Sequence, residues 1–396
     1  MTTQDNLVLS TPSPTEGLPA FRDWSRRMRD EHPVHFDEAR NAWQLFRYDD
    51  VMRAHQDHNV FSSRLDKVMP EIGDLGRGSI VIMDPPQHRK VRTLVSQAFT
   101  PRTVRGLAPR ITEITEELLS AVVDRDRFDL VSDLTYPLPV TVISELLGLP
   151  VEDREFFRRS IDARLSRDFV RVEDALTDEE LIASMEEANS YMLDHVRVLR
   201  RQPGEGLISK LITAEVDGEK LDDVEIVNFA NLLFAAGHIT TTMLLGNTML
   251  SLDEHPAAAV ELRADPDLIP SALEEVLRTR TPVSMTFRAT ATDVDLHGRT
   301  IPANSLVALW LFAANHDERQ FGEPDTFDIR RDPNPHLGFG QGIHFCLGAP
   351  LARLESKIAL EILLRRFPEL RVLRDEVEIY PNTRIIGTRR LPVAPR

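Results

Sequence analysis

Residues 339–348 read Phe-Gly-Gln-Gly-Ile-His-Phe-Cys-Leu-Gly and include Cys346, the only cysteine in the 396 residues of the chain. Pro350 follows, a residue favoured in the first turn of a helix, and apolar residues then recur at helical spacing as far as Leu363. Cys346 is therefore predicted just before a helix N-terminus, where partial positive charge favours an anionic sulfur. The glycines of this stretch lack a Cβ and allow the backbone to lie against a flat group.

A lone cysteine is most often a small buried hydrophobic residue without a chemical role. A cysteine that binds a metal acts as the thiolate, which needs the metal or a local positive field to lower its pKa. Here the surrounding pattern favours the chemical role. Phe-Gly-x-Gly-x-His-x-Cys-x-Gly resembles the haem-binding loop of the cytochrome P450 family at every position that defines it. The resemblance covers the chain from about residue 20 onward and implies that Cys346 binds the iron of haem b, with Phe339 packed near the sulfur.

The composition narrows the class of protein. A formal net charge of −16 argues against nucleic-acid binding and against a basic membrane-surface protein. One cysteine excludes an intrachain disulfide and is consistent with a reducing cytoplasm. Residues 1–6 have no basic-then-apolar signal pattern, so we expect a soluble, cytoplasmic protein without a membrane anchor.

The pattern of apolar residues predicts a mainly α protein with a small segregated β region, and the resemblance implies a cytochrome P450-like fold. The longest apolar helix is predicted to start at Asp222 and to run to about Leu252, and it is apolar nearly all round, which is typical of a buried helix. Polar residues along it argue against a membrane span. Residues 293–301, 305–312 and 372–393 have the pattern of strands. We expect an irregular segment over residues 1–20 and one haem-thiolate monooxygenase domain over residues 21–396.

Residues 235–241 of the long helix read Ala-Ala-Gly-His-Ile-Thr-Thr and resemble the central-helix motif of the family. A threonine in a helix can bond to the carbonyl four residues back and distort the turn. On its own, Thr240 would be interpreted as a structural residue packed in a buried helix. The resemblance implies instead that Thr240 is catalytic on the oxygen-binding side of the haem. Ile239 departs from the motif, which has an acid at that position. We hypothesise that protons arrive by water, by His238 or through a substrate hydroxyl.

Four further residues match the family positions that bind the haem propionates, which need cations or hydrogen bonds when they are buried. These are His88 and Arg92, one helical turn apart, together with Arg288 and His344. Each alone would more simply be a surface charge, so the expectation depends on the four together.

Glu275 and Arg278 lie at i and i+3 on a predicted helix, and such pairs are common at helix surfaces. The resemblance to the family's Glu-x-x-Arg motif implies instead a buried structural pair. Arg330 and Arg331 both lie where a later arginine of the family completes the network, and the sequence does not choose between them.

No glycine-rich nucleotide fingerprint follows a predicted strand, so electrons must come from another protein. The resemblance implies NAD(P)H as their source, with ferredoxin and ferredoxin reductase as partners. Six basic residues near the expected docking face could form a patch for an acidic ferredoxin, or could be an ordinary scatter of surface charge. They are Arg89, Lys90, Arg102, Arg105, Arg353 and Lys357.

The implied reaction inserts one atom of O2 into a C–H or C=C bond of a lipophilic small molecule, such as a polyketide, macrolide, terpenoid or fatty acid. Two alternatives are a haem-thiolate peroxygenase or isomerase that needs no reductase, and a non-catalytic haem binder. Arg384, or Arg164 and Arg167 if they face inward, would suit a substrate carboxylate. By resemblance, the apolar substrate pocket is lined by Ile82, Leu232, Ala236, Val283, Met285 and Ile385.

Overall fold

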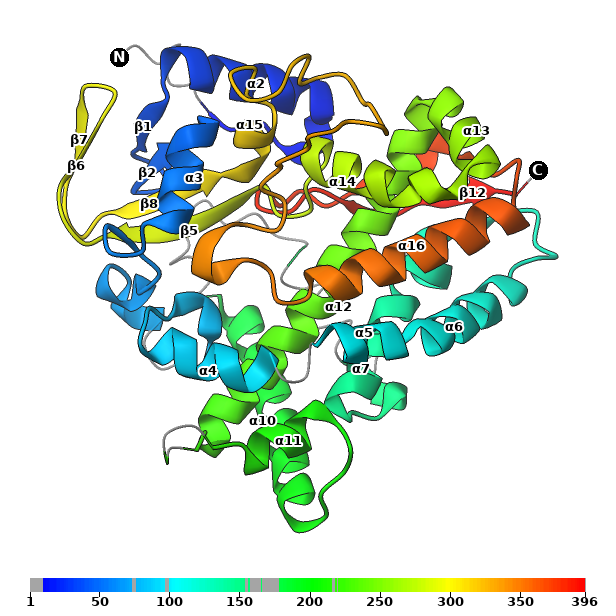
Figure 1. Ribbon diagram of the computed structural model, residues 1–396, viewed down its shortest axis with the longest axis horizontal. Helices are drawn as coiled ribbons and strands as arrows, with labels where there is room; N and C mark the ends of the chain where they lie inside the picture. Colours follow the sequence, from blue (N-terminus) through cyan, green and yellow to red (C-terminus); the bar gives the residue numbers. More distant parts are fainter. Residues whose placement is uncertain are drawn as a thin grey trace.

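The long helix predicted from the sequence is the central element of the fold. In this computed structural model α12 spans Asp223–Glu254 and runs through the middle of the molecule (Figure 1). Its first turn is closed by a capping box, in which Asp222 Oδ1 accepts from the Glu225 backbone N–H at 2.9 Å and Glu225 accepts from the Asp222 N–H at 3.0 Å. The structure describes residues 10–72, 76–96, 100–153, 156, 165, 178–215, 218 and 220–395.

Other helices surround α12. The largest contacts are with α7 (Pro137–Leu147), α10 (Glu179–Arg201), α14 (Ile269–Thr279) and α16 (Ala349–Arg366). The remaining α-helices in the described part of the chain are α2 (Leu18–Glu31), α3 (Tyr48–Gln56), α4 (Gln87–Ser96), α5 (Pro101–Gly106), α6 (Ala108–Ser120), α11 (Leu207–Thr213), α13 (Pro256–Ala264) and α15 (Leu311–Asn315). The main hydrophobic core lies among α12 and its neighbours, whereas α2, α3 and α15 pack in smaller clusters with strand residues.

Among the described residues, the strands form four small sheets at the margins of this helical body. The largest has five strands in the order β1-β2-β8-β5-β3, in which only the β2–β8 pairing is parallel. The other sheets are β4-β12-β9, β10-β11 and the hairpin β6-β7. The strands are β1 (Val34–Asp37), β2 (Ala42–Leu45), β3 (Phe61–Ser62), β4 (Phe128–Asp129), β5 (Met285–Thr290), β6 (Val294–Leu296), β7 (Arg299–Ile301), β8 (Leu306–Trp310), β9 (Arg371–Val372), β10 (Glu378–Ile379), β11 (Thr388–Arg390) and β12 (Pro392–Ala394).

This arrangement confirms the predicted mainly α fold with a segregated β region (Figure 1). Before the first long helix, α2, which starts at Leu18, a 3-10 turn at Pro14–Glu16 is held by a capping box from Ser13. The turn satisfies the local N–H groups without an apolar pattern, so periodicity alone did not predict it.

The length and composition of α12 would also suit a membrane span. Within its most apolar window, 56% of the residues are buried inside the protein, against the helices named above. Such burial is what the all-round apolar pattern predicts for a core helix.

One buried acid in this core makes a prediction for stability. The side chain of Glu355 on α16 is 1% exposed, and its Oε2 has no hydrogen-bond partner among the described residues. Burial raises the pKa of Glu355 from 4.5 to about 8.

Between those two pKa values the unfolded chain ionises at Glu355 while the folded chain keeps its proton, so stability falls as pH rises from about 4.5 to about 8. Glu355→Gln removes this titration. We expect the variant to gain up to about 3 kcal/mol over the wild type at pH 7 and only about 1 kcal/mol at pH 5.5, because each pKa unit is worth about 1.4 kcal/mol. Thermal unfolding of the holoprotein at both pH values measures the difference. Glu369→Gln, at an exposed position, is the control, and an equal gain at both pH values would contradict the assignment.

Candidate active site

The stretch 339–348 forms a tight loop before α16. The Cys346 N–H donates to the Phe339 carbonyl at 2.9 Å, which closes the loop across its ends. Gly340 and Gly342 have φ values of +66° and +69°, in the left-handed region that favours glycine. A Cβ on Gly342 would also overlap the carbonyl oxygen of His55, so this glycine is needed both for its conformation and for the close approach of α3.

The thiol of Cys346 lies two residues before Gly348, the N-cap of α16. Burial raises its pKa, while hydrogen bonds from the backbone N–H groups of Gly348 and Ala349, and the charges of Arg92 and Arg353, oppose that rise. These groups act toward an anionic sulfur, but burial is the larger effect and the pKa of Cys346 remains above its ordinary value. Among the described residues, no three or more His, Cys, Asp or Glu side chains gather to hold a metal ion.

Cationic and imidazole side chains gather next to this loop. The rings of His88 and His344 meet edge to face with centroids 4.4 Å apart. Arg92 donates to the Phe345 carbonyl at 2.8 Å, and His344 Nε2 lies 2.8 Å from Ser63 Oγ. The structure thus brings His88, Arg92 and His344, taken from two distant parts of the sequence, to one place.

Arg288 joins the same cluster through a residue that the sequence did not identify. Its guanidinium lies 3.3 Å from Nδ1 of His55, which is buried at the end of α3. Nothing in the spacing of His55 points to this contact. The two residues meet because α3 packs against β8, the neighbour of the Arg288 strand β5 in the sheet.

The positive charges of this cluster are not fully compensated by nearby acidic side chains. Burial, followed by repulsion from neighbouring cations, lowers the pKa of His344 to about 3, and burial lowers that of Arg288 to about 10. Asp84 is the nearest acid that acts on Arg288, and its two oxygens already accept from Ser62 Oγ at 2.5 Å and Ser63 N–H at 3.0 Å. The Nε2 atom of His88 is buried without a partner among the described residues. A buried group with two carboxylates, such as haem, fits this donor set.

On α12, Thr240 Oγ1 donates to the Ala236 carbonyl at 2.9 Å. This is the local bond expected of a helical threonine, whose hydroxyl shares the carbonyl four residues back with the helix backbone. Leu232, Ala236 and Thr240 follow one another at i, i+4 and i+8, so they share one face of the helix. Ala236 and Thr240 are exposed or half-buried there, whereas most of the helix is buried.

His238 and Ile239 lie on another side of α12. His238 is fully buried, its Nδ1 lies 2.6 Å from the Phe234 carbonyl, and its ring meets Tyr136 edge to face at 5.7 Å. Burial lowers the pKa of His238 to about 4, so the ring is neutral. Two positions separate His238 from Thr240, a rotation of about 200° along a helix, so the structure gives no direct path from the imidazole to that hydroxyl.

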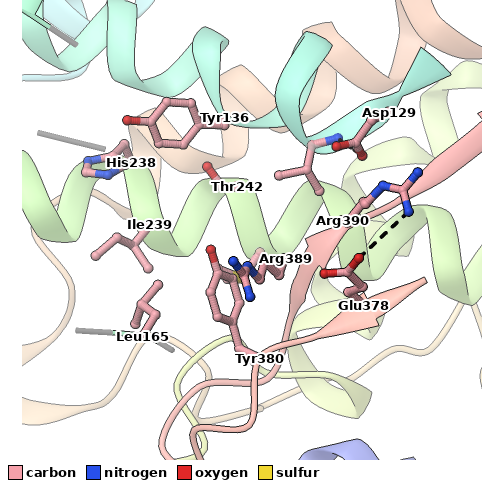
Figure 2. A pocket seen from close by; sticks show the side chains of 12 residues that line it. Asp129, Tyr136, Leu165, His238, Ile239, Thr242, Glu378, Tyr380, Arg389 and Arg390 are labelled. Atoms are coloured by element: carbon pink, nitrogen blue, oxygen red, sulfur yellow. Dashed lines mark hydrogen bonds and ion pairs between the residues drawn. The ribbon is translucent and has the colours of Figure 1, made fainter. Parts of the chain in front are cut away.

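Figure 2 shows the cavity that His238 and Ile239 face, with a volume of about 230 Å³. Leu165 and Tyr380 also line it, and an ion pair between Glu378 and Arg390 stands at its edge. None of the predicted substrate residues and no part of Thr240 belongs to its lining. The acid that the family motif has at position 239 would face this cavity, and Ile239 replaces it with an apolar wall.

The predicted substrate residues fall into separate groups. Val283 and Ile385 form an isolated antiparallel bridge beside β5, and Ile82 ends a short 3-10 turn at Ile80–Ile82. Met285 is different: its side chain is 3% exposed and packs in the core around Phe21 and Trp310. The side chain of Met285 is therefore buried, unlike the partly exposed Ile82, Val283 and Ile385. The resemblance gave the position of Met285 in the chain but not the face of the strand on which its side chain lies.

The pair Glu275–Arg278 is completely buried and bidentate, with distances of 2.8 and 2.7 Å. Arg331 Nε contacts the same carboxylate at 3.2 Å, whereas Arg330 points to the surface and pairs with Glu261. Arg331 is therefore the third member of this network, a choice that the sequence left open.

The basic residues named from the sequence are not equivalent. Arg353 forms two bonds of 2.7 Å to Glu274 and lies over the Phe339 ring at 4.6 Å. Arg384 lies over the ring of Phe287 at 5.6 Å. Arg164 and Arg167 lie outside the described residues.

Comparisons with known proteins agree with this geometry. The family model described as cytochrome P450 matches residues 29–269 and 266–392. Cyclomarin C epoxidase CymV of Salinispora arenicola is 47% identical over 96% of this chain and 97% of its own length. Erythromycin C-12 hydroxylase of Saccharopolyspora erythraea is 42% identical over 94% of each chain. The crystal structure of HmtN, a post-tailoring hydroxylase involved in himastatin biosynthesis, superposes with a TM-score of 0.86 at 44% identity, over 97% of this chain and all of the other.

Proposed function

This chain belongs to the cytochrome P450 family and is a haem-dependent monooxygenase, and we propose that Cys346 is the ligand of its haem b iron. The observation that carries this proposal is the loop in which the Cys346 N–H closes on Phe339 at a helix N-terminus. When bound, haem with a thiolate ligand activates O2 for the insertion of one oxygen atom. The remaining steps belong to side chains of this chain.

We propose that His88, Arg92, Arg288 and His344 hold the two propionates. The buried positive charges of Arg92 and Arg288 support this, because two carboxylates would compensate them, and the neutral imidazoles of His88 and His344 can donate hydrogen bonds beside them. Phe339 would cover the sulfur side of the site, together with the guanidinium of Arg353 that lies over its ring. Such cover excludes water from the thiolate, which strengthens electrostatic interactions around it.

We propose that Thr240 Oγ1 is the hydroxyl that holds a proton donor on the substrate side. Its own hydrogen is given to Ala236, so its oxygen is left to accept from a water or from a substrate hydroxyl. Ile239 offers no proton, and His238 lies on another face of the helix. Water or a substrate hydroxyl is therefore the proton source that this geometry favours.

The substrate is proposed to be a bulky lipophilic secondary metabolite, with a macrolide as the nearest analogy. Two relatives are named for an epoxidation of cyclomarin C and a hydroxylation of erythromycin. Leu232 and Ala236 on α12, Val283 and Ile385 at their bridge, and Ile82 would supply an apolar wall that suits such a molecule. The reaction on this chain's substrate is hydroxylation of a C–H bond or epoxidation of a C=C bond.

Electrons for this family come from NAD(P)H through partner proteins, and we propose a ferredoxin with its reductase. Arg353 and its partner Glu274 neutralise each other, which removes one residue from the predicted basic patch. Arg89, Arg102 and Arg105 are exposed and have no ion-pair partner within the described part of the chain. They would attract an acidic partner to the face that carries α4 and α5.

Arg102→Glu with Arg105→Glu tests this face. We expect about a tenfold lower apparent affinity for a reduced acidic ferredoxin at low salt, and a much smaller difference at 0.5 M salt, because exposed charges are screened. The reduction rate of the haem, measured by stopped flow, reports the effect. Arg201→Glu at the exposed end of α10 is the matched control, and an equal effect of both changes would place the docking face elsewhere.

The proposed function is tested by adding a panel of macrolides and other lipophilic metabolites to the ferric protein. A compound that displaces water from the iron and is then converted with ferredoxin, reductase and NAD(P)H, at one O2 for each product, supports it. Ile239 in place of an acid favours one rival, a peroxide-driven enzyme without reductase. Turnover with peroxide but not with the reductase system would establish that rival, and a spectral shift without any product would leave only haem binding.

We also propose that residues 21–396 form one domain located in the cytoplasm. One continuous core cluster contains residues from Ile80 to Val393, which supports the single domain. The bacterial relatives and the single cysteine support the location.

A further inference from the structure

A second cavity lies at the end of α12 away from Cys346, between that helix, the N-terminal segment and the β10-β11 sheet. Its volume is about 350 Å³, within the range of small-molecule sites. The walls are mainly apolar and come from three separate parts of the chain: Pro14, Leu18, Pro19, Phe21, Leu250, Val377, Ile379 and Ile386.

Asn247 forms part of the lining on the α12 side. Its amide nitrogen donates to the carbonyls of Arg280 at 2.8 Å and Ile386 at 2.9 Å, which fixes the orientation of the amide. Its Oδ1 is then a buried acceptor, and it has no hydrogen-bond partner within the described part of the chain. A buried acceptor without a donor is unfavourable, so a molecule that brings an O–H or N–H to it gains a hydrogen bond that the protein leaves open.

The charged residues around the cavity are already paired. Arg280 pairs with Glu254, and Arg374 bonds to both the carboxylate and the carbonyl of Asp253. A charged ligand would compete with these pairs, whereas a neutral apolar ligand leaves them intact.

We propose that this cavity is a second small-molecule site, for a compact neutral lipophilic molecule with one hydroxyl or N–H donor. The donor binds Asn247 Oδ1, and the apolar body lies against Leu250, Ile379 and Ile386. This site shares no residue with the cavity of Figure 2 or with the cysteine loop.

The site also couples to the substrate wall, and this part rests on the proposed function. Ile386 lines the cavity, its N–H donates to Pro282, and its neighbour Ile385 pairs with Val283. A molecule in the cavity contacts Ile386, and the adjacent residue Ile385 is proposed to contact the substrate. Binding of a molecule in the cavity then changes the affinity for substrate, and binding of substrate changes the affinity of the cavity by the same factor.

Indole supplies the probe, because it is apolar with one N–H donor, and 1-methylindole is the matched probe without a donor. The haem side of the holoprotein is first saturated with 4-phenylimidazole, so that only a second site is measured by calorimetry. We expect indole to bind with a millimolar or lower Kd, and 1-methylindole to bind about fivefold more weakly. Equal binding of the two would overturn the role of Asn247.

Leu250→Trp fills the cavity from a half-buried position on α12, and Ile379→Trp fills it from the opposite wall. Either change should abolish indole binding, while Val260→Trp, at a position that is 59% exposed on α13, should leave it unchanged. Indole binding that survives both cavity-filling changes would refute the site, whether or not the protein turns over any substrate. The site would also be refuted if 5-bromoindole occupied this cavity in soaked crystals but indole showed no binding in solution, which would mean binding at crystal concentration only.

The coupling is read from the affinity of 4-phenylimidazole for the iron, with and without indole. A change of twofold or more in the wild type, absent from Leu250→Trp, supports the link. An unchanged affinity overturns the link and leaves the second site as an independent binding cavity.

Discussion

Cys346→Ser should give a protein that folds but whose haem has lost the thiolate signature. The reduced carbonyl adduct of the wild type is expected to show the red-shifted Soret band of a thiolate-bound haem, and the variant should lack it. Haem affinity should fall by more than about 100-fold, since even changes outside the ligand shell of a metal cost 10- to 100-fold. Turnover of any substrate with ferredoxin and reductase should become undetectable, because the sulfur donates the electron density that this chemistry needs.

Gly348→Ala is the control for disturbance of the loop itself. A Cβ there would lie 3.9 Å from Cys346 Sγ, an ordinary contact, and Gly348 has a φ of −81°, which alanine adopts without strain. This variant should keep the thiolate band and most of its haem. Since Cys346 is the only cysteine, a thiolate band in Cys346→Ser would mean that the spectrum has another origin, and the assignment of the ligand would be wrong.

The elements predicted most accurately are those set by neighbours in sequence. The start of α12 was predicted within one residue because Asp222 and Glu225 satisfy each other's backbone groups locally. Residues 293–301 were predicted to be extended from their alternating pattern, and the structure divides them into β6 and β7 at Gly298, which has a φ of +73°. The helix after Cys346 follows in the same way from Pro350 and the apolar repeat.

Contacts between distant segments were not predictable in this way. His55 reaches Arg288 across 233 positions, because α3 packs against β8, which pairs with the Arg288 strand β5. Arg330 and Arg331 are adjacent in an irregular segment, where no periodicity tells which side chain faces inward. Met285 depends on three-dimensional packing in the same way, because a motif position does not specify which face of β5 its side chain occupies, and here it packs in a core cluster.

The network behind the cysteine loop predicts the largest effect on stability. Arg278 is fully buried and donates to both oxygens of Glu275, as well as to the carbonyls of Asn315, Pro324 and Thr326 at 2.7–3.0 Å. Arg278→Ala removes the arginine donor from all three carbonyls, of which only Thr326 keeps a contact, from Arg331 at 3.2 Å. It also removes the bidentate cation from the Glu275 carboxylate, which keeps Arg331, the Asp328 N–H and the Asn334 amide as donors. Removing one partner of such a buried pair costs about 3–5 kcal/mol. We expect thermal unfolding of the holoprotein at a much lower temperature, with loss of haem.

Arg330→Ala provides the matched comparison, since Arg330 lies in the same segment as Arg331 and pairs at the surface with Glu261. An exposed pair of this kind contributes no more than about 1 kcal/mol, so this variant should unfold close to the wild type. Arg278→Lys keeps the charge but cannot reproduce the planar five-donor geometry of the guanidinium. Its unfolding temperature should therefore lie between those of Arg278→Ala and Arg330→Ala. If Arg278→Ala proved as mild as Arg330→Ala, the buried pair would not be what holds α14 against the segment at residues 315–331. The haem loop would then have to be supported by the apolar contacts of α16 alone.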